Sequence, residues 1–308
     1  MSKKIRGIIL FSKPESQLTP DDYSVVRLLQ AARERDIEIQ IVCPEQFELV
    51  ITRSDEKSIL IDDKLESPPD FVIPRMGSST SYYAFAVIRQ LEHLGSYVCN
   101  GADAIYSVKD KLHMHQILST SKLSSPRTML LRYPISQIVV KREIGFPLVI
   151  KNVSGTQGVG IYLCESESKF IDIMDLIYAN NPRANIILQE FISKSYGKDL
   201  RVFVVGGKVV GCMQRSSSNS FKANFSRGGQ VSSFELTPEI EWLSTETARL
   251  FKLDIAGVDL LFDDSEFKIC EANSSPGFLG LEKVTGKVIA ESIIDYILLR
   301  IGLNSEIN

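Results

Sequence analysis

The 308-residue chain has no apolar run long enough to cross a membrane and no strong excess of charge of either sign. A membrane-spanning helix needs roughly 18 or more apolar residues, and the first apolar stretch, which ends at Phe11, is too short even for a secretory signal. The net charge of −3 argues against a protein held on nucleic acid by bulk electrostatics. We therefore expect a cytoplasmic protein that binds neither membrane nor nucleic acid.

Cysteine and histidine are also scarce. Five cysteines are spread along the chain without a close pair, at Cys43, Cys99, Cys164, Cys212 and Cys270. We expect free thiols in a reducing compartment rather than disulfides or metal ligands. His113 and His115 would point to different sides of a helix, so we expect packing or surface roles instead of a shared metal ion.

The first hundred residues alternate between strand and helix patterns. The expected strands are Ile5–Phe11, Ile37–Val42 and Phe71–Pro74. Thr19 and Pro20 are typical of a helix start, and a second helix over Ser81–Leu94 should end at Gly95. Strands separated by helices predict a small, largely parallel α/β domain.

The remainder is richer in strands. A helix is expected at 110–121, and the later helices at 166–179, 238–252 and 284–301. The expected strands are 147–151, 159–163, 186–191, 200–205, 208–215, 255–262 and 267–272. Tight turns such as Val205–Lys208 indicate antiparallel pairing, and hence an α+β region after the α/β one.

The segment Lys151–Leu163, KNVSGTQGVGIYL, carries glycines at 155, 158 and 160. A Walker A loop needs its lysine after the glycines and a helix behind it, and a dinucleotide fingerprint needs the spacing G-x-G-x-x-G, so neither applies. Two interpretations remain open from the residues alone. The segment is either a plain structural hairpin or a flexible tip that closes over phosphate.

Two strand-like segments, Ala256–Phe262 (AGVDLLF) and Phe267–Asn273 (FKICEAN), form an expected β-hairpin. With a tip at Asp264–Glu266, Asp259 faces Glu271, and Asn273 projects from the same face. Two opposed carboxylates should repel unless a cation lies between them, and oxygen ligands suit Mg²⁺. The alternative is a pair of edge-strand acids that face water, which the apolar flanking residues disfavour.

These motifs together resemble the RimK-type ligases of the ATP-grasp fold. The resemblance covers nearly the whole chain. It is carried by PRMGSS at 74–79, RQLEHLGSYVCN at 89–100, KDKL at 109–112, KNVSGTQGVG at 151–160, LQEFI at 188–192, DLR at 199–201, NFSRGG at 224–229, GVDL at 257–260 and EANSSPGFLGLEKVTG at 271–286.

The resemblance implies an ATP-grasp fold behind an N-terminal parallel α/β domain. The implied regions are a pre-ATP-grasp domain over 1–105, a small subdomain with the glycine-rich lid over 106–189, and a C-terminal subdomain with the metal site over 190–308.

It also implies roles for individual residues. The implied metal ligands are Asp259, Glu271 and Asn273. The nucleotide would contact Lys111, Lys151, Gly155, Gly158, Gly160, Glu190, Phe191, Asp199, Lys222, Ala223 and Asn224. Groups around the reacting atoms would be Arg201, Arg215, Asn224 and Arg227. Lys222 and Ser226 depart from the arginine and histidine expected in glutamate-ligating members, and both lie in the loop expected to touch substrate.

Arg75 follows an expected strand, and Gly77, Ser78 and Ser79 come directly after it. We assign Arg75, Ser78 and Lys222 to substrate binding, with an acceptor carboxylate on Arg75. An interdomain salt bridge is the alternative for Arg75.

The implied reaction is ATP-dependent amide formation through an acyl phosphate, with Mg²⁺ (two ions, replaceable by Mn²⁺) and no covalent enzyme nucleophile. Glutamate is the expected amine, and the acceptor a carboxylate such as a protein C-terminus. Ligation of another amino acid to a small molecule, or a non-catalytic ATP-binding module, are the alternatives. A homo-oligomer, dimer or tetramer, is expected.

Overall fold

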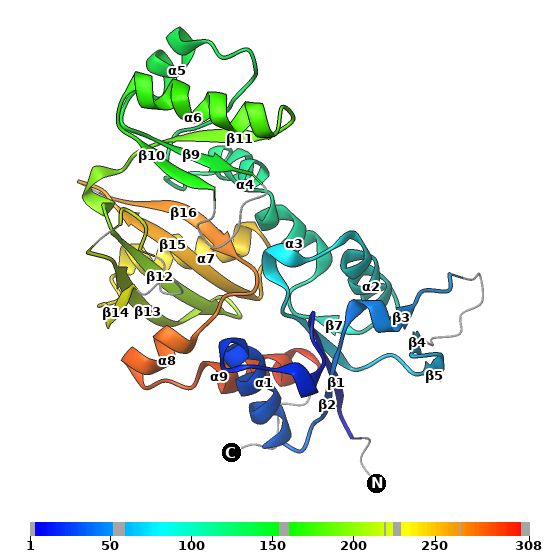
Figure 1. Cartoon of the computed structure of the whole chain (residues 1–308). Coiled ribbons are helices and arrows are strands. Elements are labelled where there is room, and N and C mark those ends of the chain that lie inside the picture. Colours follow the sequence, from blue (N-terminus) through cyan, green and yellow to red (C-terminus); the bar gives the residue numbers. More distant parts are fainter. Residues whose placement is uncertain are drawn as a thin grey trace.

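The computed structural model describes residues 4–51, 59–153, 160–218, 220–223, 229–264 and 266–302. Figure 1 shows the N-terminal elements in blue and cyan, a small sheet with its helices in green, and a larger sheet in yellow-green to orange. No helix within the described ranges has both the length and the apolar character to cross a membrane.

The N-terminal region is built on a parallel sheet of order β2-β1-β6-β7, as predicted. Its elements are β1 (Arg6–Leu10), α1 (Tyr23–Arg33), β2 (Glu38–Val42), β6 (Phe71–Pro74), α2 (Tyr82–His93), β7 (Tyr97–Val98) and α3 (Ala102–Lys109). A small antiparallel sheet, which was not predicted, consists of β3 (Phe47–Glu48), β4 (Ile59–Ile61) and β5 (Lys64–Glu66).

The predicted helix signals in this region are confirmed. The Thr19 N–H donates to Asp22 Oδ2 at 2.9 Å, which forms a capping box just before α1. Ser81 Oγ accepts the Ala84 N–H at 3.1 Å and begins α2. Gly95, with φ +95°, lies just beyond the end of α2 in the conformation that only glycine adopts readily.

Two antiparallel sheets follow, with orders β10-β9-β11-β8 and β14-β13-β12-β15-β16. The smaller comprises β8 (Thr128–Leu130), β9 (Leu148–Asn152), β10 (Ile161–Cys164) and β11 (Ile186–Glu190), with α4 (Lys111–Ser119), α5 (Gln137–Glu143) and α6 (Glu167–Asn180). The larger comprises β12 (Lys198–Val205), β13 (Lys208–Ser216), β14 (Gln230–Ser233), β15 (Ile255–Phe262) and β16 (Phe267–Asn273), with α7 (Pro238–Leu250), α8 (Leu279–Thr285) and α9 (Ile289–Arg300).

The turn between β12 and β13 shows why its residues are glycine. Gly206 and Gly207 have φ of +56° and +76°, values that a two-residue hairpin turn requires. A Cβ at Gly206 would also lie 2.4 Å from the Tyr296 ring. The predicted antiparallel pairing of these strands is confirmed.

One predicted helix is wrong in extent. The helix expected over 284–301 is two helices, because α8 ends at Gly286, whose φ is +65°. The Glu282 side chain then accepts the Ile289 N–H at 2.7 Å at the start of α9.

The helix expected at 110–121 is α4, and α3 precedes it as a separate helix. Asp110 separates the two by accepting the Leu112 and His113 N–H groups at 2.9 and 3.0 Å.

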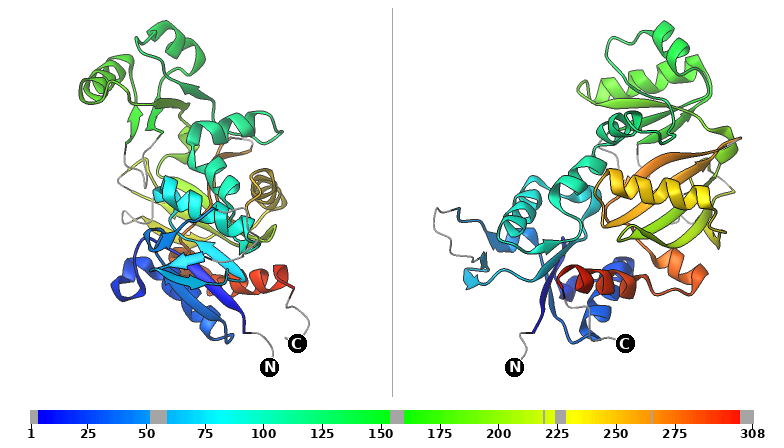
Figure 2. Two further views of the ribbon diagram at one scale, coloured as in Figure 1. Left: turned by 90° about the vertical axis from the view of Figure 1, so that its right-hand side faces the viewer. Right: turned by 180° about the vertical axis from the view of Figure 1, so that it is seen from behind.

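The C-terminal helix returns to the N-terminal region. In Figures 1 and 2, α9 (red) lies beside α1 (dark blue). One buried cluster contains Ile9 of β1, Leu28 of α1, Phe203 of β12, Phe278 just before α8, and Ile293 of α9. The N-terminal sheet and the large sheet therefore share a hydrophobic core, while the exact boundaries at 105 and 189 stay predictions.

Asn100 is the polar link between these two regions. It is buried, and its Nδ2 donates to the carbonyls of Ile255 and Ser274, both at 2.7 Å. Its Oδ1 accepts the Ile255 N–H at 2.9 Å. One side chain thus satisfies three backbone groups at the ends of β15 and β16, which positions the N-terminal region against the large sheet.

We expect Asn100→Ala to lower the free energy of unfolding by about 3 kcal/mol, since it leaves buried backbone groups without partners. Urea denaturation of the purified protein measures this. Asn180→Ala is the control, because Asn180 is exposed and its one side-chain hydrogen bond among the described residues is to Leu176 in its own helix. Equal stability of the two variants would show that Asn100 is not the link described.

Candidate active site

One face of the large sheet is apolar toward one end and charged toward the other. Phe203 of β12 and Met213 of β13 point into the core shared with the N-terminal region. Side chains alternate between faces along a strand, so Arg201, two residues before Phe203, emerges on the same face as Phe203. Arg215, two residues after Met213, does the same on β13. The charged part of this face is the candidate active site.

The hairpin of β15 and β16 brings the predicted acids together, although its tip is not as predicted. Phe262 pairs with Phe267, and the Asp263 N–H donates to Glu266 O at 3.1 Å, so the turn is one residue longer. A β-bulge at Cys270 then restores the predicted register. Asp259 faces Glu271, and Gly257 faces Asn273.

A chain of ion pairs crosses the site. Arg201 makes a two-pronged contact with Asp259, one arm of which, Nη2 to Oδ2, is 2.8 Å long. Arg215 Nη2 reaches the same Oδ2 at 3.0 Å, and its Nε and Nη2 both bond to Asp199 at 2.7 Å. Two arginines therefore share the buried Asp259.

These contacts determine the charge state of Asp259. Burial raises the pKa of its carboxyl group, but Arg201 and Arg215 more than offset this, so the pKa lies below its ordinary value. Arg215 loses hydration on burial, yet Asp259 and Asp199 raise its pKa above the ordinary value. The charged forms of Asp259 and Arg215 are thus favoured, whereas burial raises the pKa of Asp199 despite its contact with Arg215.

The Asp259 carboxylate, which faces Glu271, is already paired with two arginines. Repulsion between Asp259 and Glu271 was expected to require a cation between them. Two guanidinium groups already compensate Asp259, so repulsion by itself demands no metal. The metal assignment rests on the oxygen donors and the family resemblance instead.

Those donors suit Mg²⁺ chemically. Glu271 forms no ion pair with any described residue, so its carboxylate is available. Asn273 Nδ2 donates to Gly257 O at 3.2 Å, which leaves its Oδ1 as a further acceptor. With Asp259, these are oxygen ligands on adjacent strands. The described residues contain no cluster of three or more His, Cys, Asp or Glu side chains placed to hold a metal, so the set needs the Asn273 amide.

The two predicted phosphate lysines come from the small sheet and its helix. Lys111 is the first residue of α4, and Lys151 lies on β9. Lys151 Nζ approaches Cys270 Sγ of β16 at 3.7 Å, so it reaches from the small sheet to the large one. Figure 1 shows β9 of the small sheet above β16 of the large sheet.

The predicted linker residues Glu190 and Phe191 lie at the end of β11. Glu190 Oε1 accepts from Lys268 Nζ at 2.8 Å, and the Glu190 N–H donates to the Arg127 carbonyl at 3.0 Å. Phe191 packs edge-to-face on Tyr196, with ring centroids 6.2 Å apart.

The loop after β13 supplies the remaining described candidates. Lys222 Nζ lies over the Phe221 and Tyr162 rings, 5.5 and 5.9 Å from their centroids, and Ala223 is buried. Gly160, with φ +72°, leads into β10, and its carbonyl accepts the Asn152 N–H at 3.0 Å. The other predicted residues of the lid and loop lie outside the described residues: Gly155, Gly158, Asn224, Ser226 and Arg227.

Arg75 lies at the carboxyl end of β6, where a parallel sheet commonly binds its ligand. Its Nη2 donates to Pro276 O at 2.8 Å, while Nε and Nη1 are buried without a hydrogen-bond partner. Burial lowers the pKa of this guanidinium to about 10. The alternative interdomain salt bridge is wrong for the described part of the chain, since the contact across the regions is a carbonyl. Ser78 lies in the short 3₁₀ helix that follows (Gly77–Ser79).

Sequence reasoning missed a buried polar pair between α4 and β11. His115 Nε2 and Gln189 Nε2 are 2.7 Å apart, and Gln189 Nε2 also donates to Thr128 Oγ1 at 2.7 Å. Burial and then the charge of Lys151 lower the pKa of His115 to about 3, so the ring is neutral. His113 instead lies beside Tyr106, which confirms that the two histidines do not converge.

All five cysteines are free, as predicted.

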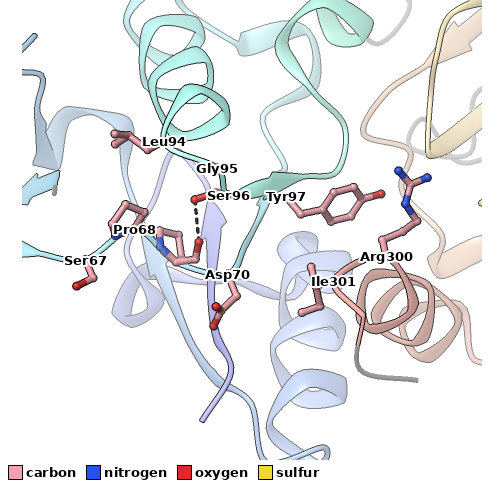
Figure 3. Close-up of a pocket in the computed structure, with 10 residues that line it drawn as sticks. Ser67, Pro68, Asp70, Leu94, Gly95, Ser96, Tyr97, Arg300 and Ile301 are labelled. Atoms are coloured by element: carbon pink, nitrogen blue, oxygen red, sulfur yellow. Dashed lines mark hydrogen bonds between the residues drawn. The ribbon is translucent and has the colours of Figure 1, made fainter. Parts of the chain in front are cut away.

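A separate hollow of about 590 Å³ lies at the opposite end of the N-terminal sheet (Figure 3). Its lining includes Asp70, just before β6, and Arg300 and Ile301 at the end of α9. Arg75 follows β6 at its other end. This hollow therefore does not belong to the candidate active site.

The architecture is that of the ATP-grasp ligases. The structure of the ATP-grasp ligase PsnB complexed with a phosphomimetic variant of its minimal precursor, Mg and ADP matches with a TM-score of 0.72 at 18% identity, over 97% of this chain and 99% of that chain. D-alanine–D-alanine ligase from Bacillus anthracis complexed with ATP matches with a TM-score of 0.69 at 16% identity, over 97% of each chain. At these identities the similarity shows the fold.

The family follows from sequence comparison. A RimK-like ATP-grasp domain model matches residues 108–297, and a RimK pre-ATP-grasp domain model matches residues 14–105. A protein of Methanococcoides burtonii named probable alpha-L-glutamate ligase is 39% identical over 277 residues, 89% of this chain and 91% of that protein. One of the same name from Marinomonas sp. is 37% identical over 281 residues, 90% and 92% of the two chains. The chain belongs to the RimK-like ATP-grasp family.

The ion pairs separate the effects of two isosteric substitutions on stability. Asp259→Asn should lower the free energy of unfolding by about 3 kcal/mol, because two buried guanidinium groups lose their shared charge. Glu271→Gln should change it by less than about 0.5 kcal/mol, since no described ion pair is lost. Denaturant melts without added metal compare the two. If Asp259→Asn were as stable as the unaltered protein, repulsion from Glu271 would outweigh the arginine contacts.

Proposed function

We propose that this protein is an ATP-dependent ligase that joins the amino group of L-glutamate to an acceptor carboxylate and releases ADP and phosphate. The observation that carries the proposal is the row of ion pairs Asp199–Arg215–Asp259–Arg201 on the large sheet, together with Lys151, which reaches from the small sheet to Cys270 of β16. The names of two relatives of the chain, both probable alpha-L-glutamate ligase, also support the proposal.

The proposed reaction has two steps. An acceptor carboxylate oxygen attacks the γ-phosphorus of ATP, the bond to the β-phosphate oxygen breaks, and ADP leaves. The amine nitrogen then attacks the acyl carbon, and phosphate leaves with the electrons of the broken C–O bond while the nitrogen loses a proton. Both steps need dense positive charge and exclusion of water rather than an enzyme nucleophile.

The proposed roles follow from position. Asp259, Glu271 and Asn273 would hold Mg²⁺, as two ions or with Mn²⁺ as a substitute, and the metal would neutralise phosphate charge. Lys111 and Lys151 would bind phosphate oxygens. The nucleobase and ribose would contact the Glu190–Phe191 linker, with Asp199, Lys222 and Ala223 nearby.

The arginines would bind the anionic groups that react. Arg201 and Arg215 carry two-pronged donors, which suit carboxylates and phosphates. Asn224 and Arg227 are the other two residues proposed to lie around the reacting groups. The proposed lid contains Gly155, Gly158 and Gly160. Lys222 would help to select the side chain of the amino acid.

Arg75 is the proposed anchor of the acceptor. A buried guanidinium whose Nε and Nη1 both lack an acceptor is costly unless an anion completes it. Its partner Pro276 is three residues beyond Asn273, so Arg75 is near the proposed metal ligands. A carboxylate held there, with Ser78 as a neighbour, would present its acyl carbon toward the charged row.

Two other functions remain to be separated by experiment: ligation of a different amino acid to a small molecule, and ATP binding without catalysis. The intact charged row and the lysine that reaches the large sheet favour catalysis. We further propose that the enzyme works in the cytoplasm as a homo-oligomer, a dimer or a tetramer, and that a protein C-terminus is one acceptor class.

The decisive measurement is ADP release in the presence of Mg²⁺, with glutamate, alanine or lysine as the amine. Each is tested with peptides that end in glutamate and with small dicarboxylates as acceptors. We expect glutamate to stimulate ADP release at least about tenfold more than lysine, because the site is rich in cations. Stimulation by lysine instead would contradict glutamate as the amine, and ATP binding without any turnover would indicate the non-catalytic module.

Arg75→Met tests the acceptor site. We expect the KM for the acceptor to rise at least about tenfold and the KM for ATP to stay within about twofold, since a two-pronged charged contact is lost. The melting temperature should hold or rise, because an unpaired buried charge is removed. Arg89→Met, at an exposed position on α2, is the matched control. A loss of stability with an unchanged acceptor KM would assign Arg75 a structural role.

A further inference from the structure

The contact between Lys151 and Cys270 joins the small sheet to the large one. Lys151 projects from β9 of the small sheet, and Cys270 belongs to β16, the edge strand of the large one. Their Nζ and Sγ atoms are 3.7 Å apart, a hydrogen-bond distance for sulfur. Lys151 is therefore held at a defined point between the sheets.

The β-bulge explains how a thiol comes to lie there. Leu260 pairs with Ile269 and Asp259 with Glu271, so Cys270 is the extra residue that has no partner on β15. A bulge re-aims side chains and is frequent beside active sites. Here it keeps Asp259 opposite Glu271 and turns Cys270 to the lysine.

Lys151 contacts a thiol and forms no ion pair with a described residue, although the carboxylates of Glu271, Asp259 and Asp199 act on the same thiol from a greater distance. Within the described ranges, Lys151 makes no ion pair, whereas Arg201 and Arg215 are both bound to aspartates. The nearby His115 accepts the Gln189 amide proton on Nε2 and carries no charge. A thiol is a weak acceptor, so it can orient an ammonium group without neutralising it.

We propose that Cys270 is a positioning residue, which holds Lys151 between the two sheets as a cation that forms no ion pair and can bind a nucleotide phosphate. This inference rests on the proposed function. A carboxylate at position 270 would pair with Lys151 and compete with the phosphate. A hydroxyl would orient the lysine as the thiol does, and an apolar side chain would leave it unheld.

The test is equilibrium binding of ADP and of adenosine, by calorimetry, to Cys270→Asp, Cys270→Ser and Cys270→Val. We expect ADP to bind at least about tenfold more weakly to Cys270→Asp, about threefold more weakly to Cys270→Val, and within about twofold of the unaltered protein for Cys270→Ser. Adenosine, which has no phosphate, should bind all three equally. Cys43→Asp is the matched control, because Cys43 is also partly buried but lies in the N-terminal region.

A background substitution keeps the test decisive where Cys270→Asp perturbs folding. In a Lys151→Met background, adding Cys270→Asp should cause no further loss of ADP affinity. An equal loss with and without the lysine, or a parallel loss of adenosine binding, would overturn the positioning role. If Cys270→Asp bound ADP as tightly as the unaltered protein does, the positioning role would be overturned and the proposed function would stand. If the unaltered protein bound neither ADP nor ATP, the proposed function would be overturned as well.

Discussion

The sharing of Asp259 by Arg201 and Arg215 is the interaction on which the candidate site depends. A buried carboxylate is costly without a partner, and buried guanidinium groups are equally so. Because Arg215 also binds Asp199, the four charges lie in one connected row across β13, β12 and β15. Removing Asp259 leaves Arg201 without its described ion-pair partner, and removing Arg215 does the same to Asp199, so the arrangement of the site and its stability are linked.

The row can exist only because the sheet beneath it is anchored elsewhere. The same face of β12 that carries Arg201 continues into Phe203 and Val205, which pack in the core shared with the N-terminal region. Asn100 ties that region to the ends of β15 and β16 through three hydrogen bonds. The apolar half of the face thus holds the charged half at the junction of the regions, close to Arg75.

The two antiparallel sheets differ in how their cationic side chains are paired. The large sheet pairs its arginines with aspartates, while the small sheet presents Lys151 beside a thiol and a neutral imidazole. Paired arginines keep a fixed geometry, and an unpaired lysine keeps its full attraction for an anion. This division suits a site that must bind a polyphosphate and also orient carboxylates.

The chain's local patterns were enough to predict most of the strands, the caps at Thr19 and Ser81, and the facing of Asp259 and Glu271. Such features depend on neighbours close in sequence or on the twofold alternation of a strand. The break at Gly286 was missed because an apolar pattern continues through it. The bulge at Cys270 was missed because a bulge depends on the partner strand.

By itself, then, the sequence determined the order of the elements, the antiparallel hairpin and the family resemblance, since each is written in spacing along the chain. Tertiary structure alone decided that Asp259 is compensated by two arginines, that Arg75 is buried with unpaired N–H groups, and that Lys151 reaches Cys270. The physical reason is that compensation and burial depend on which distant segments the fold brings within a few ångströms, and no local pattern encodes that distance.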